Sequence, residues 1–343
     1  MTINFTLQRM GSSLKRNLQQ KIHDYIAKGF FSEKVGRILE GFYSDYVQAA
    51  LSQGYSHSKI EALLEQFLKL VLEQLKNPYE FGLFHKRITE PFDYYQFGLE
   101  MIRPLVIKEQ SRVLGLPALD QIRSRVAQGD NVILFSNHQT EPDPQIINLL
   151  LEDSYKEFAS EMIFVAGDRV VTDPLAAPLS IGCNLLCIYS KKHIDNPPEQ
   201  KEEKLLHNQR TMKKMLELLS IGGNCIYVAP SGGRDRLNER GQPTVASFDP
   251  NNIEMFSLFA KKAKKKTTFF TLSLYTYPIL PPPEKVEEEI GEMRKASASP
   301  AHLYFGEEID FMDEKSGRTK EEKRKIRAET IWNQVRTNYE KLF

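Results

Sequence analysis

Cysteine is scarce in this sequence: three residues occur among 343, at Cys183, Cys187 and Cys225. The first two lie too close together for a disulfide framework, and the three lack the repeated spacing of a zinc site. A disulfide-stabilised secreted domain and a zinc-binding module are therefore excluded. We expect buried thiols in a reducing compartment.

Long apolar runs are also missing. A membrane-spanning helix needs about 20 apolar residues, and the longest uncharged stretches, 174–190 and 267–283, are broken by prolines and polar residues. The first 21 residues contain no apolar core of a signal peptide and are not clearly a transit peptide. We expect a protein with at most peripheral membrane contact in the bacterial cytoplasm, with the plastid stroma as the alternative.

Charge of one sign is not in excess either, because the net charge is only +1. This balance gives no reason to expect a nucleic-acid partner. The 41% of hydrophobic residues is typical of a globular protein, and 343 residues are enough for more than one domain.

The first part of the chain has helical periodicity. Apolar residues recur at three- and four-residue steps in two segments, around 39–47 and 60–71. Turn residues separate these segments and recur at 77–78. The pattern predicts a small helical bundle over residues 1–78, followed by a linker over 77–86 and a larger domain over 79–343.

The second part alternates between strand-like and helix-like segments. Short β-rich runs occur at 131–136, 162–166, 184–189, 224–229, 268–275 and 303–305. Helical segments lie at 144–152, 199–220, 251–265 and 319–341. This alternation predicts an α/β fold with a mixed, largely parallel sheet flanked by helices, preceded by the N-terminal helical bundle.

The first predicted strand ends in a loop that contains His138 and Asp143. In such folds, ligands bind beyond the carboxyl ends of the strands. A carboxylate on one imidazole nitrogen orients the ring so that the other nitrogen can take a proton from a hydroxyl. Two other interpretations stay open: Asp143 caps the next helix, with Pro144 at its first position, beside an ordinary loop histidine, or the two residues bind a metal, although no third ligand stands nearby.

Cationic residues follow two further predicted strands. Lys191, Lys192 and His193 come after one, and Arg234 and Arg236 follow the Gly232-Gly233 pair after the other. Several positive groups at one edge of a sheet suit a dianionic phosphate. The alternative is a pair of solvated surface loops.

These three segments resemble a known family. The segment 137–143 fits the His-x4-Asp signature of glycerolipid acyltransferases, and 190–193 and 229–236 look like two further blocks of the soluble, plastid-type glycerol-3-phosphate acyltransferases. The similarity extends to Phe42-Tyr43, 167–170 and Phe248-Asp249. Membrane-bound relatives usually have a Glu-Gly-Thr-Arg type block where this chain has 231–234, which favours the soluble branch.

The resemblance implies transfer of a fatty acyl group from acyl carrier protein, or from coenzyme A, to the sn-1 hydroxyl of glycerol 3-phosphate. It implies His138 and Asp143 as the catalytic pair, without a metal, a cofactor or a covalent acyl-enzyme. The acceptor phosphate would be held by Lys192, His193, Arg234 and Arg236.

Other functions remain open from the sequence. The acceptor could be another phosphorylated molecule such as lysophosphatidate, and a non-catalytic acyl-carrier or phospholipid-binding protein or a metal-dependent phosphatase are further alternatives. The lysine-rich segment 261–266 could attract the acidic acyl carrier protein, or be only a solvated helix end.

Overall fold

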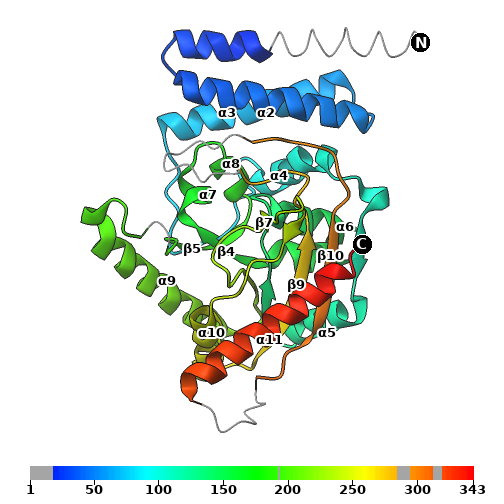
Figure 1. Cartoon of the computed structure of the whole chain (residues 1–343). Helices are drawn as coiled ribbons and strands as arrows, with labels where there is room; N and C mark the ends of the chain where they lie inside the picture. Colours follow the sequence, from blue (N-terminus) through cyan, green and yellow to red (C-terminus); the bar gives the residue numbers. More distant parts are fainter. Residues whose placement is uncertain (1–17, 192–193, 284–293, 312–318) are drawn as a thin grey trace.

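The computed structural model describes residues 18–191, 194–283, 294–311 and 319–343. In Figure 1 the N-terminal helices form a layer of their own above an α/β body that contains the sheet. The longer helices are α2 (Glu33–Ser52), α3 (His57–Lys76), α4 (Tyr94–Ile102), α5 (Leu116–Ala127), α6 (Asp143–Glu161), α9 (Lys201–Ile221), α10 (Pro250–Lys262) and α11 (Lys320–Glu340). Two short helices, α7 (Asp168–Thr172) and α8 (Ala177–Ser180), lie between the fourth and fifth strands.

The N-terminal helices begin at capping residues and bury one face. Ser32 and Ser56 accept hydrogen bonds from the backbone of the first turns of α2 and α3, as N-cap serines commonly do. The hydroxyl of Tyr46 on α2, which is fully buried, donates to the backbone oxygen of Met101 at 2.8 Å, so α2 is tied to the end of α4. These helices share one apolar cluster with α4 and the segment around Leu280. The division at residue 78 stays a prediction.

The central sheet has the order β1-β5-β4-β6-β3-β9-β10-β2. Its strands are β1 (Phe84–His85), β2 (Arg112–Leu114), β3 (Asn131–Ser136), β4 (Ile163–Gly167), β5 (Asn184–Ile188), β6 (Cys225–Val228), β9 (Thr267–Tyr275) and β10 (His302–Glu308). Pairing is parallel throughout except between β1 and β5 and between β9 and β10. The predicted mixed, largely parallel sheet with flanking helices is therefore confirmed.

Strand β3 shows how the sheet separates two apolar layers. Val132 and Leu134 pack in one cluster with residues of α5 and α6, whereas Ile133 and Phe135 pack in another with residues of α9, α10 and α11. Alternate side chains of a strand point to opposite faces, and a central parallel strand is covered on both. All six residues of β3 are buried for this reason.

Several elements and one helix cap differ from the prediction. The predicted linker 77–86 contains the short edge strand β1, which pairs with β5. Edge strand β2 was not predicted, because three residues at a sheet edge leave no period-2 pattern to detect. Helices α4 and α5 were not predicted either. Asp143 is the first residue of α6, whose N-cap is Pro142, so the predicted capping role of Asp143 is wrong.

The described part of the chain contains no helix that is both long enough and apolar enough to cross a bilayer. The three cysteines are free and buried, as predicted. Burial raises the pKa of the Cys183 and Cys187 thiols to about 12.

Candidate active site

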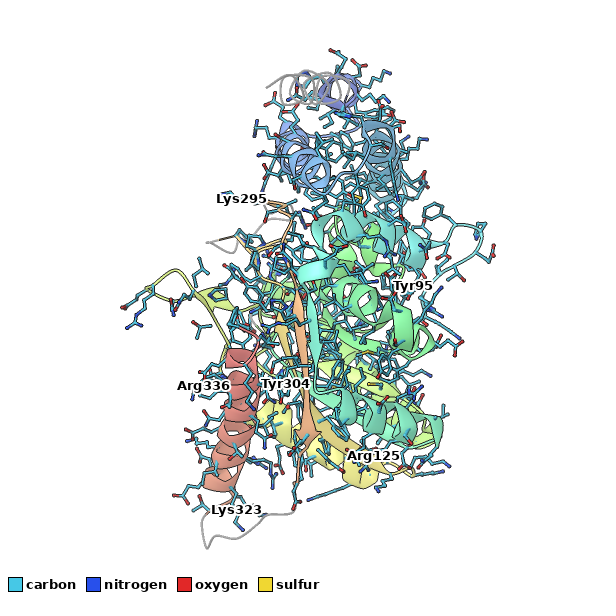
Figure 2. All side chains as sticks on the ribbon, turned by 90° about the vertical axis from the view of Figure 1, so that its right-hand side faces the viewer. Tyr95, Arg125, Lys295, Tyr304, Lys323 and Arg336 are labelled. Carbon is cyan, nitrogen blue, oxygen red and sulfur yellow. The ribbon has the colours of Figure 1, made fainter. Side chains whose placement is uncertain are left out.

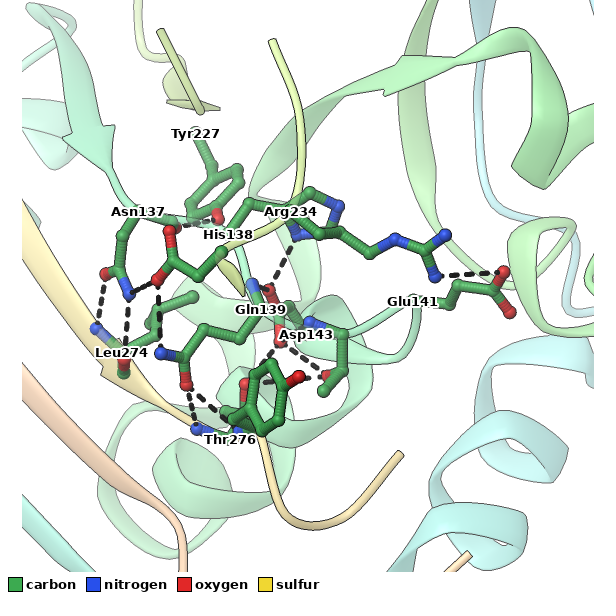
Figure 3. A network of polar contacts seen from close by, with 12 residues as sticks. Asn137, His138, Gln139, Glu141, Asp143, Tyr227, Arg234, Leu274 and Thr276 are labelled. Atoms are coloured by element: carbon green, nitrogen blue, oxygen red, sulfur yellow. Dashed lines mark hydrogen bonds and ion pairs between the residues drawn. The ribbon is translucent and has the colours of Figure 1, made fainter. Parts of the chain in front are cut away.

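The loop that follows β3 brings His138 and Asp143 together. His138 Nδ1 lies 2.7 Å from Asp143 Oδ2, and Figure 3 shows the contact beside the residues that hold it. The imidazole is partly exposed, at 28%, while the carboxylate is 1% exposed. An ionised carboxylate only accepts hydrogen bonds, so Nδ1 carries the proton and Nε2 keeps a lone pair. The predicted contact is present, with one nitrogen left for proton transfer.

Asp143 is fixed by four donors besides His138. Oδ2 accepts from the Gln139 backbone, and Oδ1 accepts from the Thr140 backbone and from the hydroxyls of Thr140 and Thr276, the two hydroxyls at 2.6 Å each. Burial opposes ionisation, but the bonds from His138, Thr140 and Thr276 outweigh it and hold the pKa of Asp143 below its ordinary value. The carboxylate is thus occupied by the loop that precedes it, which is why it does not cap α6.

Asn137 and Gln139 extend the pairing of β3 with β9 by means of their side chains. The Asn137 amide exchanges two hydrogen bonds with the Leu274 backbone, at 2.8 and 2.9 Å. Gln139 Oε1 accepts from the backbone of Thr276 and Tyr277, at 2.7 and 3.0 Å. His138 lies between these two anchors, so the loop that carries it is held to a rigid strand.

Asp235 supports the same loop from the other side, although no role was predicted for it from the sequence. It is fully buried; Oδ2 accepts from Asn137 and Gln139, and its backbone nitrogen donates to the His138 carbonyl at 2.7 Å. Burial raises the pKa of Asp235 to about 6, against the lowering effect of these hydrogen bonds. The buried carboxyl therefore links the 229–236 segment to the histidine loop.

This raised pKa predicts a measurable pH effect. The ordinary value is 3.8 and the folded value is about 6, so the folded state binds the proton more tightly. The contribution of Asp235 to the free energy of unfolding is then complete below about pH 4 and is lost as the pH rises through about 6, by roughly 3 kcal/mol in total. Urea unfolding of wild type and Asp235→Asn should be measured between pH 4 and 7. As the pH rises, the free energy of unfolding of wild type should fall relative to that of the variant by roughly 3 kcal/mol.

A stability difference that does not change with pH would contradict this prediction. Asp153, a surface carboxylate that is 74% exposed, offers a matched Asp→Asn control on the same protein.

Arg234 lies close to the histidine loop. Its Nη1 is 3.5 Å from Glu141 Oε1, and the Arg234 side chain is 15% exposed. Gly232, two residues earlier, has a φ of +66°, a conformation that glycine adopts without strain. Arg236 donates from Nη1 to the Pro283 carbonyl at 2.8 Å. Lys192 and His193 lie outside the described residues, and their neighbour Lys191 pairs with Asp249 at 2.7 Å.

Glu141 and Arg294 form a buried ion pair that the sequence did not reveal. Arg294 Nε and Nη2 lie 3.0 and 3.3 Å from the two oxygens of Glu141, and Nη2 also lies 2.8 Å from Asp173 Oδ2. Burial raises the pKa of Glu141, but Arg294 and Arg234 lower it more, so this carboxyl is ionised. Glu141 lies within the His-x4-Asp segment 137–143, so the sequence could have drawn attention to it, but nothing in the sequence pointed to Arg294.

An apolar pocket lies next to this ion pair. Glu141 and Arg294 are the charged residues that line it; the apolar residues come from the N-terminal helices, from the end of α4 and the 3₁₀ turn that follows it, and from the segments around Leu175 and Leu280. The pocket is therefore apolar along its walls and charged at one end.

The lysine-rich segment 261–266 lies at the end of the strands opposite to the His138 loop. It ends directly before the first residue of β9, and the Lys266 carbonyl accepts from Asn131 at the start of β3. The His138 loop follows the last residue of β3 and contacts Thr276 just beyond β9. Nine residues of β9 separate the two, which corresponds to about 30 Å. The location of these lysines therefore does not support a role in bringing an acidic acyl donor protein to His138.

Comparison with known proteins identifies the family. A family model described as "Acyltransferase" matches residues 119–281, which includes the His138 loop and the 229–236 segment. A chloroplastic glycerol-3-phosphate acyltransferase of Spinacia oleracea is 39% identical over 315 residues, covering 91% of this chain and 67% of that protein. The corresponding protein of Pisum sativum is 36% identical over 321 residues, with 92% and 70% covered.

A solved structure was also found, that of a 1-acyl-sn-glycerophosphate acyltransferase from Thermotoga maritima. It is 18% identical, with a TM-score of 0.38, and covers 71% of this chain and 77% of that one; this similarity is too low to support an argument. The sequence similarities, which cover 91% and 92% of this chain, are sufficient by themselves. The chain belongs to the same family as the chloroplastic glycerol-3-phosphate acyltransferases.

Proposed function

We propose that this enzyme transfers a fatty acyl group from a thioester to the sn-1 hydroxyl of glycerol 3-phosphate, with His138 as the general base. Acyl transfer to glycerol 3-phosphate is the activity of the family to which the chain belongs. The observation that supports the base is the contact of 2.7 Å between His138 Nδ1 and a buried, ionised Asp143, which leaves Nε2 to accept a proton.

The proton and the bonds can be followed through one step. Nε2 takes the proton of the attacking hydroxyl while its oxygen bonds to the thioester carbonyl carbon, and Asp143 stabilises the imidazolium that forms. The carbon–sulfur bond then breaks, and the thiolate accepts the proton from His138. The products are 1-acylglycerol 3-phosphate and a free thiol.

The acceptor phosphate is proposed to bind near Arg234 and Arg236, together with Lys192 and His193. The described residues support this at Arg234, whose guanidinium lies next to Glu141 in the histidine loop. A fixed phosphate would hold the far hydroxyl beside His138, and such positioning makes the attack effectively unimolecular. The apolar pocket lined by Leu175, Leu280 and the N-terminal helices is where we place the acyl chain of the donor.

The donor is proposed to be acyl carrier protein, with coenzyme A as the alternative. Cytoplasm and plastid stroma remain the two proposed compartments, and the chloroplastic relatives support the second.

Acyl transfer to radiolabelled glycerol 3-phosphate tests this proposal. Purified protein is incubated with acyl carrier protein and coenzyme A thioesters in separate reactions, and we expect label in 1-acylglycerol 3-phosphate with both, at a higher kcat/KM for the acyl carrier protein thioester. No labelled product from either donor would contradict the reaction. Product from vesicle-bound lysophosphatidate instead would indicate the alternative acceptor.

A further inference from the structure

Arg294 connects three segments that are far apart in the sequence. Its guanidinium contacts Glu141 in the loop after β3 and Asp173 just after α7. The other oxygen of Asp173 accepts from the Leu175 backbone at 2.8 Å. The contact between Arg294 and Asp173 therefore also holds the segment of Leu175, which lines the apolar pocket. Figure 2 shows Lys295, the next residue, where the N-terminal helices meet the rest of the chain.

Glu141 is shared unequally between two arginines. Arg294 binds both of its oxygens, at 3.0 and 3.3 Å, whereas Arg234 Nη1 lies 3.5 Å from one of them. The side chains of all three residues are largely buried, with 10% of Arg294, 15% of Arg234 and 17% of Glu141 exposed. In such surroundings a carboxylate that loses one cationic partner is left as a costly, under-compensated charge, so a closer approach of the remaining cation is favoured.

We infer that Arg294 is a positioning residue for acceptor binding, which acts through Glu141 on Arg234. By neutralising Glu141, it leaves the Arg234 guanidinium oriented, with its charge available to the phosphate of glycerol 3-phosphate. Without Arg294, Glu141 draws Arg234 into a closer ion pair that competes with the phosphate. This inference rests on the proposed function, in which Arg234 binds the acceptor.

A purely structural role of Arg294 would lead to a different result. If Arg294 only joined the loop to α7, its loss would lower stability and kcat in parallel and leave the KM for glycerol 3-phosphate unchanged, and neutralising Glu141 would recover part of the stability alone. If it acts through Glu141, its loss raises the KM for glycerol 3-phosphate, and the KM recovers when the competing charge is removed.

The test is a double-mutant cycle of Arg294→Met and Glu141→Gln, with kcat, the KM for glycerol 3-phosphate and the unfolding temperature measured for each variant. We expect Arg294→Met to raise this KM by between about threefold and a hundredfold, the range for contacting charged groups, with a smaller change in kcat. The double variant should return the KM to within about threefold of Glu141→Gln alone. Arg294→Lys, which keeps the charge but not the planar fork, should lie between wild type and Arg294→Met.

An unchanged KM in Arg294→Met, or a raised KM that Glu141→Gln does not restore, would overturn the inference. If Arg294→Met does not fold, the same cycle with Arg294→Lys decides by the same criterion. Arg234→Ala is the reference: if it leaves the KM unchanged, the phosphate site itself is wrong. If it raises the KM while the Arg294 variants do not, only the role of Arg294 fails.

Discussion

Replacing His138 by alanine is expected to lower kcat by about 10²–10⁴-fold, the usual contribution of a general base. The ring is partly exposed and its Nδ1 contacts Asp143, so the loss concerns mainly the proton transfer and not the core. Steady-state acyl transfer with saturating donor and glycerol 3-phosphate measures the effect. The KM for glycerol 3-phosphate should change little, since the proposed phosphate contacts are left in place.

His207 provides a matched control for this experiment. It is a half-buried histidine whose Nε2 is 3.0 Å from the Cys187 carbonyl, and it has no place in the proposed reaction. His207→Ala should keep a kcat near that of wild type. Near-normal turnover in His138→Ala would show that another group takes the proton.

Asp143→Asn is expected to have the second large effect, also about 10²–10⁴-fold on kcat. The substitution preserves size but removes the charge that stabilises the imidazolium and that fixes the proton on Nδ1. It also places an amide where five donors converge on one carboxylate. Stability should fall as well, by about 1–3 kcal/mol, because a buried donor loses its acceptor.

The two consequences of Asp143→Asn can be separated. Thr276→Val removes one donor to the same carboxylate and leaves its charge, so it should lower the free energy of unfolding with a much smaller loss of kcat. If Thr276→Val and Asp143→Asn lowered kcat equally, hydrogen-bonded order in the loop would matter more than the charge, and the proposed role of Asp143 would be wrong.

The sequence was a good guide to the regular elements of the α/β part. The six apolar runs correspond to β3, β4, β5, β6, β9 and β10, and the four helical segments correspond to α6, α9, α10 and α11. The strands are largely buried and therefore appear as continuous apolar runs, and the helices are long enough to be recognised as helical segments between them. The two-residue strand β1 and the three-residue strand β2 are too short to leave such a pattern.

The contact of His138 with Asp143 could also be predicted, because five residues in a loop before a helix leave the two side chains within reach. The same local reasoning failed for the cap of α6. A capping residue and a carboxylate that accepts from the preceding loop look alike in sequence, and only the donors Thr140 and Thr276 decide between them. One of these donors, Thr276, lies just after β9 and 133 positions away in the sequence.

By itself, therefore, the sequence determined the order of strands and helices, the location of the reactive loop and the pairing of His138 with Asp143, since these depend on periodicity and short-range geometry. Only the tertiary structure decided that Asp235 supports the histidine loop, that Arg294 joins Glu141 to Asp173, and that the lysines at 261–266 lie at the opposite end of the strands from that loop. Arg294 is 153 positions from Glu141 and 121 from Asp173. Contacts between segments so far apart arise when the sheet and its covering helices are assembled, and no local pattern of residues encodes them.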